Sequence, residues 1–288
     1  MAASPVSTVT LTSDGLDVVH MPAPLPLPMR VLVKGPSTVV WLSEMGGQRT
    51  DFTFPRSLEA HLLAAGQPVQ VLNTAIASER AKTTLRSWQR EILAWSPDVV
   101  ILLYGQYESI HLIAPWWLER HANSLRRRPG RVREAYRKRL LGPAWMSLAR
   151  FQAKLDRKID STVFGGRPRR IVAHLERLIE RSQLTGSPLV YVFEILPPAK
   201  RWQSWFPGMA ERTVVMNAAI ADLIDRIDKP NVRLFPMQDL VKRHFTDIEE
   251  ATPDGGHFSA ELHRVIGEAL SADILEWAAT QPHLKPPA

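Results

Sequence analysis

Five short, largely apolar runs without regular polar alternation constrain the fold of this chain more than any other feature. They cover residues 30–33, 69–72, 99–103, 189–195 and 232–235. Helical patterns lie between the runs, and Gly or Pro residues follow several of them. A strand that is apolar on both faces must be covered on both faces, as in a parallel sheet with helices on each side. The pattern therefore predicts an α/β/α sandwich with about five parallel strands.

The expected domain organisation follows from the same pattern. Residues 30–277 form one domain, preceded by a Pro-rich lead-in over 1–29 and followed by a tail over 278–288. A mostly helical stretch over 111–185 interrupts the alternation of strands and helices and is interpreted as an insertion. Ligands of open parallel sheets bind beyond the carboxyl ends of the strands, so functional residues are expected in the loops that begin there.

Positive charge is concentrated in this insertion. Residues 119–170 contain 16 Lys and Arg against 4 Asp and Glu, whereas the rest of the chain contains 20 against 25. A solvated helical hairpin is one interpretation. The other is an anionic partner, which would be a phosphate-bearing substrate, a membrane surface contacted peripherally, or nucleic acid. Nucleic acid is the least favoured of the three, because no DNA- or RNA-binding motif is recognisable.

Composition excludes several kinds of chemistry. The chain has no Cys, which rules out disulfides, thiolate metal sites and cysteine nucleophiles. No apolar run reaches the roughly 18 residues of a membrane span, and the first 29 residues lack the basic start of a secretory signal. A cytoplasmic protein is therefore expected. His111 and His121 have no neighbouring cluster of ligands, so no metal and no cofactor are expected.

Two strand-end motifs carry groups typical of nucleophilic catalysis. Ser37 follows the first strand in a tight Gly-Pro-Ser turn, where a hydroxyl and backbone N–H groups stand together. Asp254 precedes His257 across two glycines, a spacing that lets the acid hold one imidazole nitrogen and leave the other free. The structural alternatives are an N-cap serine at Ser37, and an N-cap aspartate with an incidental histidine at 254–257.

Together the motifs resemble those of the SGNH (GDSL-like) hydrolases, over about residues 30–110 and 186–277. Four blocks carry the resemblance, namely Gly35-Pro36-Ser37, Asn73 to Ser78, Gly105-Gln106-Tyr107-Glu108 and Asp254-Gly255-Gly256-His257. The resemblance implies a flavodoxin-like sandwich and a serine acyl-enzyme mechanism. In that mechanism Ser37 is the nucleophile, His257 the general base and Asp254 the residue that orients it.

The resemblance also implies an oxyanion hole and a supporting loop. The hole would use the backbone N–H groups of Ser37 and Ser78 and a side chain of the third block. Tyr107 stands where the family has asparagine, Ser78 where glycine is usual, and Pro36 where aspartate is usual. Gln106 could replace the asparagine only if the loop shifted by one residue. Gly105, Gln106 and Glu108 are expected to support the loop.

Aromatic residues near two of the expected loops are candidates for contact with substrate. Trp202, Trp205 and Arg201 lie on a Pro- and Gly-rich segment after the fourth strand, which is interpreted as a loop. Trp116 and Trp117 would either wall a pocket or pack in the interior.

The sequence therefore predicts a serine esterase acting on an O-acylated small molecule, glycan or lipid-linked compound, with an anionic group on the substrate as an option. An acyltransferase would use the same acyl-enzyme. A degenerate domain that binds an anionic glycan or a membrane surface is the second class, motivated by Tyr107. The retention of Ser37, Asp254 and His257 favours an enzyme.

Overall fold

A five-stranded parallel sheet forms the centre of the protein. The computed structural model describes residues 27–110, 121, 130–158 and 166–284. The strands are β1 (Met29–Lys34), β4 (Val69–Asn73), β5 (Val99–Leu102), β6 (Leu189–Phe193) and β7 (Val232–Phe235), in the order β4-β1-β5-β6-β7. Every neighbouring pair is parallel. The strands coincide within two residues with the five apolar runs of the sequence, and the predicted fold class is confirmed.

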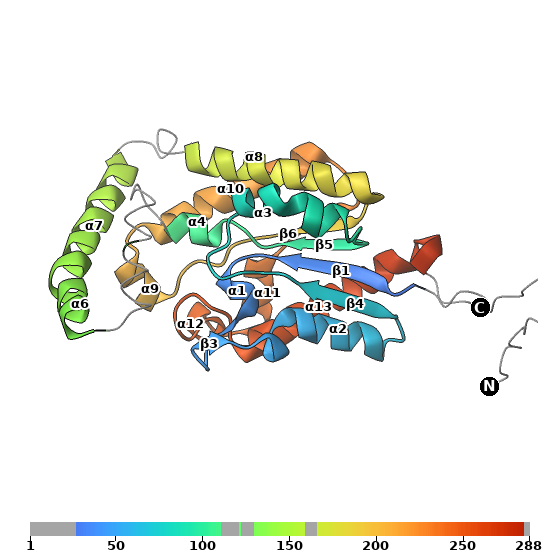
Figure 1. Ribbon diagram of the computed structural model, residues 1–288, viewed down its shortest axis with the longest axis horizontal. Coiled ribbons are helices and arrows are strands. Elements are labelled where there is room, and N and C mark those ends of the chain that lie inside the picture. The colour runs from blue at the N-terminus through green and yellow to red at the C-terminus, as the bar shows by residue number, and fades with distance from the viewer. Residues whose placement is uncertain (1–26, 111–120, 122–129, 159–165, 285–288) are drawn as a thin grey trace, which may run out of the picture.

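Helices cover both faces of this sheet (Figure 1). The helices on one face include α2 (Phe54–Ala64), α11 (Met237–His244) and α13 (Ala260–Ala279), and those on the other include α3 (Ala81–Trp88), α8 (Gly166–Ser182) and α10 (Met209–Ile227). Along β1, Val31 and Val33 belong to the first core, and Leu32 belongs to the second. Because both faces are buried, the strands need no polar alternation.

The insertion expected over 111–185 is shorter at its carboxyl end. Leu175 and Leu178 of α8 are fully buried against the sheet, so this helix is part of the sandwich. What remains in the described chain is α6 (Arg131–Tyr136), a π-helical turn (Arg137–Leu141) and α7 (Gly142–Lys158). We call residues 131–158 the arm. The rest of the expected insertion, including His111, Trp116 and Trp117, lies outside the described residues.

Both ends of the domain also differ from the expected ones. Met29 is fully buried in β1 rather than part of a lead-in. At the other end, α13 runs to Ala279, and a short turn (Pro282–Leu284) buries Leu284 against the first core. Residues 1–26 and 285–288 lie outside the described part of the chain.

Several short elements were not predicted. These are the antiparallel pair β2 (Trp41–Leu42) and β3 (Gly47–Gln48), α4 (Gln106–Ile110), α9 (Lys200–Trp205), α11 and α12 (Ile248–Ala251). The prediction of a loop over Trp202 and Trp205 is therefore wrong. The six residues of α9 form fewer than two helical turns between Pro198 and Pro207, which is too short for a periodic pattern to be recognised. A helix beginning beside Ser37, which the N-cap alternative implied, is present as α1 (Ser37–Val40).

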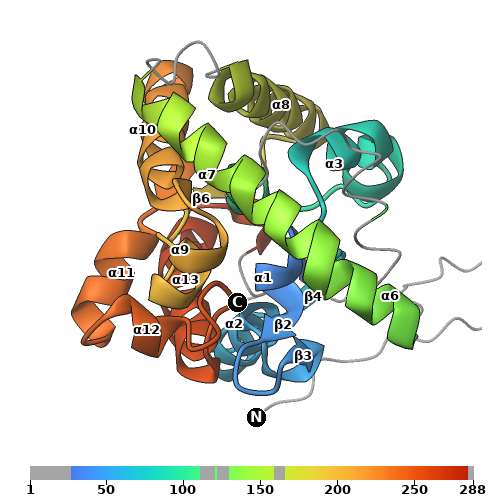
Figure 2. The ribbon, with the colours of Figure 1, turned by 90° about the vertical axis from the view of Figure 1, so that its left-hand side faces the viewer.

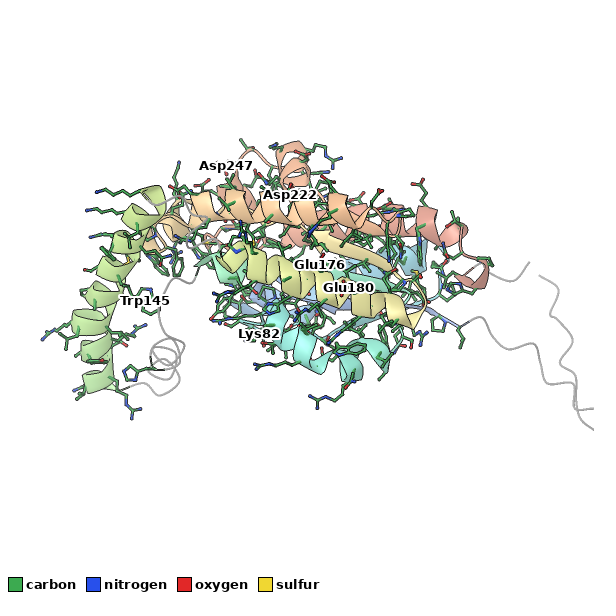
Figure 3. All side chains as sticks on the ribbon, turned by 90° about the horizontal axis from the view of Figure 1, so that it is seen from above. Lys82, Trp145, Glu176, Glu180, Asp222 and Asp247 are labelled. Atoms are coloured by element: carbon green, nitrogen blue, oxygen red, sulfur yellow. The ribbon has the colours of Figure 1, made fainter. Side chains whose placement is uncertain are left out.

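The arm projects from the two helical layers that cover the sheet. Seen from above, α8 and α10 lie side by side over the sheet with Glu176, Glu180 and Asp222, while the arm with Trp145 projects at one end (Figure 3). Within the described ranges, no helix is both long and apolar enough to span a bilayer.

Candidate active site

The predicted site residues gather at the carboxyl end of the sheet. This is the end at which α1 follows β1, and α9, α12 and the arm lie at the same end (Figures 1 and 2). The loop after β4 joins it through a hydrogen bond from the backbone N–H of Ile76 to the carbonyl of Gly35, at 3.1 Å. Parallel strands thus bring segments that are far apart in the sequence to one edge, as the topology requires.

Ser37 is the first residue of α1, directly after a tight turn. A Cβ on Gly35 would lie 2.6 Å from Val39 Cγ2 and 2.9 Å from the carbonyl oxygen of Leu103, so only glycine fits there. Pro36 then begins the short helix, in extended conformation. Ser37 itself is half-buried, and its Oγ lies 2.9 Å from His257 Nε2. The two residues are 220 positions apart in the sequence.

Asp254 holds the other side of the imidazole. Its Oδ2 lies 2.7 Å from His257 Nδ1, and its Oδ1 accepts hydrogen bonds from the backbone N–H groups of Gly256 and His257, at 3.0 and 2.8 Å. Burial alone would raise the pKa of Asp254, but these hydrogen bonds outweigh burial and lower its pKa below the ordinary value. Asp254 therefore stays a carboxylate, and Ser37, His257 and Asp254 form one continuous hydrogen-bonded chain.

Two tryptophans fix the plane of the His257 ring. Trp41 stacks on it, with ring centroids 5.0 Å apart and 24° between the planes. Trp202, from α9, meets it edge-on at 5.5 Å and 87°. The sequence suggested Trp202 as a substrate contact. It gave no signal for Trp41 beyond its position one helical turn after Ser37.

The two glycines before His257 serve this packing. Gly255 has φ +104°, which disfavours any side chain. Gly256 has no such angle, but a Cβ there would lie 2.4 Å from the Trp202 ring. The glycines are therefore needed less for freedom to turn the imidazole, as the sequence suggested, than for the close approach of Trp202.

Ser78 occupies a left-handed backbone position, with φ +65°. Glycine adopts this conformation without strain, which agrees with the glycine that the SGNH hydrolases usually carry there. Ser78 is exposed, and no residue in the described part of the chain accepts a hydrogen bond from its backbone N–H. The N–H of Ser37 has no acceptor within α1, because Ser37 is the first residue of that helix.

The third block does not place an amide beside Ser37. Gln106 is buried, and its Nε2 donates to the carbonyl of Gly256 at 2.8 Å, so its amide holds the histidine loop. Tyr107 is half-buried, with the Arg80 guanidinium over its ring at 5.3 Å from the centroid. Arg80 follows Ser78 by two residues, so Tyr107 lies against the loop that carries Ser78.

Glu108 braces the end of β5. Its Oε2 accepts from the backbone N–H of Gly105 at 3.0 Å, and its Oε1 from that of Ala81 at 3.3 Å. Burial raises the pKa of this carboxyl, although the hydrogen bonds and Arg80 oppose the shift. Gly105 has φ +109°, and a Cβ there would lie 2.5 Å from Ile195. The contacts of Glu108 agree with a supporting rather than a reacting group.

The outer residues of α9 lie away from the histidine. Trp205 is 49% exposed, and the Arg201 guanidinium lies over its ring at 5.5 Å from the centroid. Of the three predicted substrate contacts, only Trp202 has a contact with the Ser37–His257–Asp254 chain.

A buried charge network beneath the site was missed by the sequence reasoning. Lys34, the last residue of β1, is fully buried, and its Nζ lies 3.0 Å from Glu79 Oε1, 2.5 Å from Glu91 Oε2 and 3.0 Å from the carbonyl oxygen of Thr74. Burial raises the pKa of Glu79 even though Lys34 opposes the shift. The only signal was a lysine at the end of an apolar run.

Metal ligation has no support among the described residues, where no group of three His, Cys, Asp or Glu could hold an ion. His121 instead lies edge-on to the ring of Tyr136 on the arm, at 5.9 Å and 74°.

Comparison with known proteins places the fold. No family model matches the chain, and no curated protein matches its sequence. A lipase/acylhydrolase from Enterococcus faecalis has a similar structure, with a TM-score of 0.57 and 14% identity over 90% of this chain and 99% of that one. The aryl esterase of M. smegmatis has a TM-score of 0.54 and 16% identity, over 86% of this chain and 99% of that one. Est24, a carbohydrate acetylesterase from Sinorhizobium meliloti, has a TM-score of 0.52 and 15% identity, over 86% of this chain and 99% of that one. These likenesses show an SGNH-hydrolase-like α/β/α fold, as the motifs implied.

Proposed function

We propose that this protein is a serine-dependent ester hydrolase of the SGNH type, which forms an acyl-enzyme on Ser37. One observation carries the proposal, namely the hydrogen-bonded chain from Ser37 Oγ to His257 at 2.9 Å and from His257 to Asp254 at 2.7 Å. A nucleophile, a base and an orienting acid in contact define the minimum machinery of acyl transfer. The names of the three similar structures, an acylhydrolase and two esterases, also favour ester chemistry.

Each group has one role in the proposed reaction. Ser37 Oγ attacks the ester carbonyl carbon while His257 Nε2 takes the hydroxyl proton, and the Asp254 carboxylate stabilises the resulting imidazolium. The tetrahedral intermediate collapses, the C–O bond to the alcohol breaks, and the alcohol leaves with the proton from His257. Water then attacks the acyl-enzyme with the same base, which releases the carboxylic acid and restores Ser37.

The oxyanion would be held by the backbone N–H groups of Ser37 and Ser78. The Tyr107 hydroxyl is the candidate for a third donor in place of the family's asparagine. Loss of one such donor lowers the rate by about 10²–10³. If Tyr107 does not reach the oxyanion, the enzyme is slower by that factor but uses the same mechanism.

The substrate in this proposal is an O-acylated small molecule, glycan or lipid-linked compound. Trp202 lies beside the catalytic histidine and would bound the reacting end of the substrate. Arg201 and Trp205 occupy the solvent side of α9, where they would meet the far end of a larger alcohol. An anionic group there would be favoured by Arg201.

Hydrolysis of p-nitrophenyl acetate tests this proposal. We expect Ser37→Ala and Asp254→Asn to lower kcat by about 10⁴ or more, because each removes a member of the triad. The control Ser87→Ala, a serine of α3 that bonds only to its own helix, should keep wild-type activity. The proposal would be wrong if the folded wild type hydrolysed the ester no faster than Ser37→Ala.

A further inference from the structure

A row of apolar side chains on the arm faces solvent. Val132 and Tyr136 of α6 and Leu140 of the π-helical turn recur every four residues, and Phe151 extends the row along α7. Val132 is 83% exposed, Leu140 63% and Phe151 58%. Single exposed apolar residues are common on proteins, but a row of them on one element indicates an interaction surface. We call these four residues the apolar row.

The opposite side of α7 attaches the arm to the body. Ala149, Gln152 and Ala153 are buried. Ala153 lies close to Gly208, where an added Cβ would be 3.2 Å from the Ala153 Cβ. Residues 149 and 153 are one helical turn apart, and residue 151 lies on the other side of the helix. The apolar row on α7 therefore points away from the body that the small residues contact.

Cations flank the apolar row. Residues 131–158 contain nine Lys and Arg against two Asp and Glu. The exposed ones include Arg131, Arg139, Arg150, Lys154 and Lys158. The rest of the chain contains 27 Lys and Arg against 27 Asp and Glu, so it has no net charge of its own. The formal net charge of +7 is therefore equal to the excess on the arm alone.

This combination distinguishes between partners. A helix with exposed apolar residues and flanking cations is typical of helices that lie in a lipid interface, where acyl chains take the apolar side chains and anionic headgroups the cations. Nucleic acid would satisfy the cations but offers no partner for Val132, Leu140 and Phe151. A second copy of the chain would bring a second arm of the same charge, which opposes pairing through this surface.

We propose that the arm docks the protein peripherally onto an anionic bilayer. The cations contact headgroups, and Val132, Leu140 and Phe151 enter the boundary between headgroups and acyl chains. Docking brings the carboxyl end of the sheet towards the membrane, because the arm and α1 lie at the same end (Figures 1 and 2). If the proposed function holds, which this last step requires, the substrate class is an ester carried by a membrane lipid or a lipid-linked compound.

Vesicle co-sedimentation of the full-length protein tests the docking without relying on catalysis. The vesicles contain either phosphatidylcholine alone or equal parts of phosphatidylglycerol and phosphatidylcholine. The row variant is Val132→Ser with Leu140→Ser and Phe151→Ser. Its matched control carries Leu63→Ser, Leu184→Ser and Val214→Ser, three exposed apolar residues on elements other than the arm. The charge variant is Arg139→Gln with Arg150→Gln and Lys154→Gln.

We expect wild type and matched control to bind the anionic vesicles, and added salt to weaken the binding. Each cation near an anionic surface contributes about fivefold to partitioning, so the charge variant should bind about 100-fold more weakly. The row variant should also bind the anionic vesicles at least about tenfold more weakly than wild type. Ser37→Ala should bind them like wild type, whatever its activity.

Three results would overturn the docking proposal. The first is a folded wild type that binds neither kind of vesicle. The second is a row variant that binds as tightly as wild type, because binding through charge alone would fit any polyanion, including nucleic acid. The third is self-association that the row variant abolishes in the absence of vesicle binding. Circular dichroism of each variant establishes that it is folded, so that lost binding is assigned to the surface.

Discussion

At the scale of single residues, the imidazole of His257 is held from four directions. Ser37 and Asp254 contact its two nitrogens, while Trp41 stacks on the ring and Trp202 packs perpendicular to it. A general base must be within hydrogen-bond reach of the proton that it removes, so the ring orientation matters as much as its basicity. The tryptophans supply that orientation through packing.

Gly256→Ala tests the role of this packing. The added Cβ would lie 2.4 Å from the Trp202 ring, so this ring must shift from its present packing against His257. We expect kcat/KM to fall at least about tenfold and the free energy of unfolding to fall by about 1–3 kcal/mol, as for other overpacked sites. The measurements are ester hydrolysis and urea unfolding.

Gly130→Ala is the matched control, because nothing lies within 4 Å of a Cβ at that position and the backbone there is extended. It should keep wild-type kcat/KM and lower the free energy of unfolding by less than about 1 kcal/mol, because Gly130 is only the N-cap of α6. Wild-type activity in Gly256→Ala would mean that Trp202 does not position the histidine.

The pairing of Ser37, Asp254 and His257 was predictable because each residue follows a recognisable break in the chain. Trp41 and Lys34 were not predictable. The roles of these two residues come from contacts with His257, Glu79 and Glu91, which the fold brings together from distant parts of the sequence. No local pattern reports such contacts.

At the scale of elements, the loop after β4 is fixed by a charge inside the protein. Lys34 Nζ contacts the carbonyl of Thr74 and the carboxylate of Glu79. It therefore holds the loop at a residue before Ser78 and at another after it. A buried ion pair need not add stability, but removal of one partner leaves the other charge uncompensated. The network thus fixes the position of the backbone that presents Ser78.

Lys34→Met is expected to lower the free energy of unfolding by about 3–5 kcal/mol, because it leaves Glu79 buried without its cation. Adding Glu79→Gln should restore part of this loss, since it removes the unpaired charge. Urea unfolding of the two variants measures both effects. Equal destabilisation by Lys34→Met and by the double variant would show that the loss comes from packing and not from charge.

The long elements were predicted well and the short ones poorly. The five strands are largely apolar segments of four to six residues, and the central ones, β1, β5 and β6, are almost wholly buried, which leaves a clear sequence signal. The pair β2–β3 has two residues in each strand, and α9 has six residues in all. Elements of this size are fixed by tertiary contacts, such as that of Trp202 with Gly255 and Gly256.

At the scale of the whole molecule, His263 links the site to global stability. It is fully buried in α13, and its Nδ1 accepts from the backbone N–H of Phe54 at 3.0 Å while Nε2 lies 3.1 Å from the carbonyl oxygen of Trp41. Burial lowers the pKa of His263 to about 4, against the opposing effect of the Trp41 carbonyl. The native state therefore holds this histidine neutral.

His263 should make the protein less stable in acid. An unfolded histidine has a pKa of about 6.5, so between that pH and about 4 the unfolded state binds one more proton than the native state. The free energy of unfolding then falls as the pH drops, and we expect His263 to contribute a loss of about 2 kcal/mol between pH 7 and pH 5. Urea unfolding at both pH values measures this loss.

His263→Gln keeps a donor and an acceptor but does not titrate, so its stability should change less between the two pH values. His244→Gln, at an exposed position of α11, should behave like wild type. The same pH dependence in His263→Gln and in wild type would assign the loss to other groups.

The layered architecture was predictable from the sequence, but where the sandwich ends and the arm begins was not. The burial of α8 depends on contacts with α3 and the sheet. Because its sequence is basic and helical like the stretch before it, the sequence alone did not separate the two. The orientation of the arm over the carboxyl end of the sheet likewise follows from tertiary packing near Gly208.

Covalent labelling with a fluorophosphonate tests the assignment of Ser37 most directly. The reagent reacts with an activated serine and needs no knowledge of the natural ester. Intact-mass and peptide mass spectrometry of the folded protein should show one adduct, on Ser37, which is absent in Ser37→Ala and in His257→Ala and present in Ser87→Ala. A folded wild type that forms no adduct, or one on another serine, would contradict the assignment of Ser37, His257 and Asp254 as a catalytic triad.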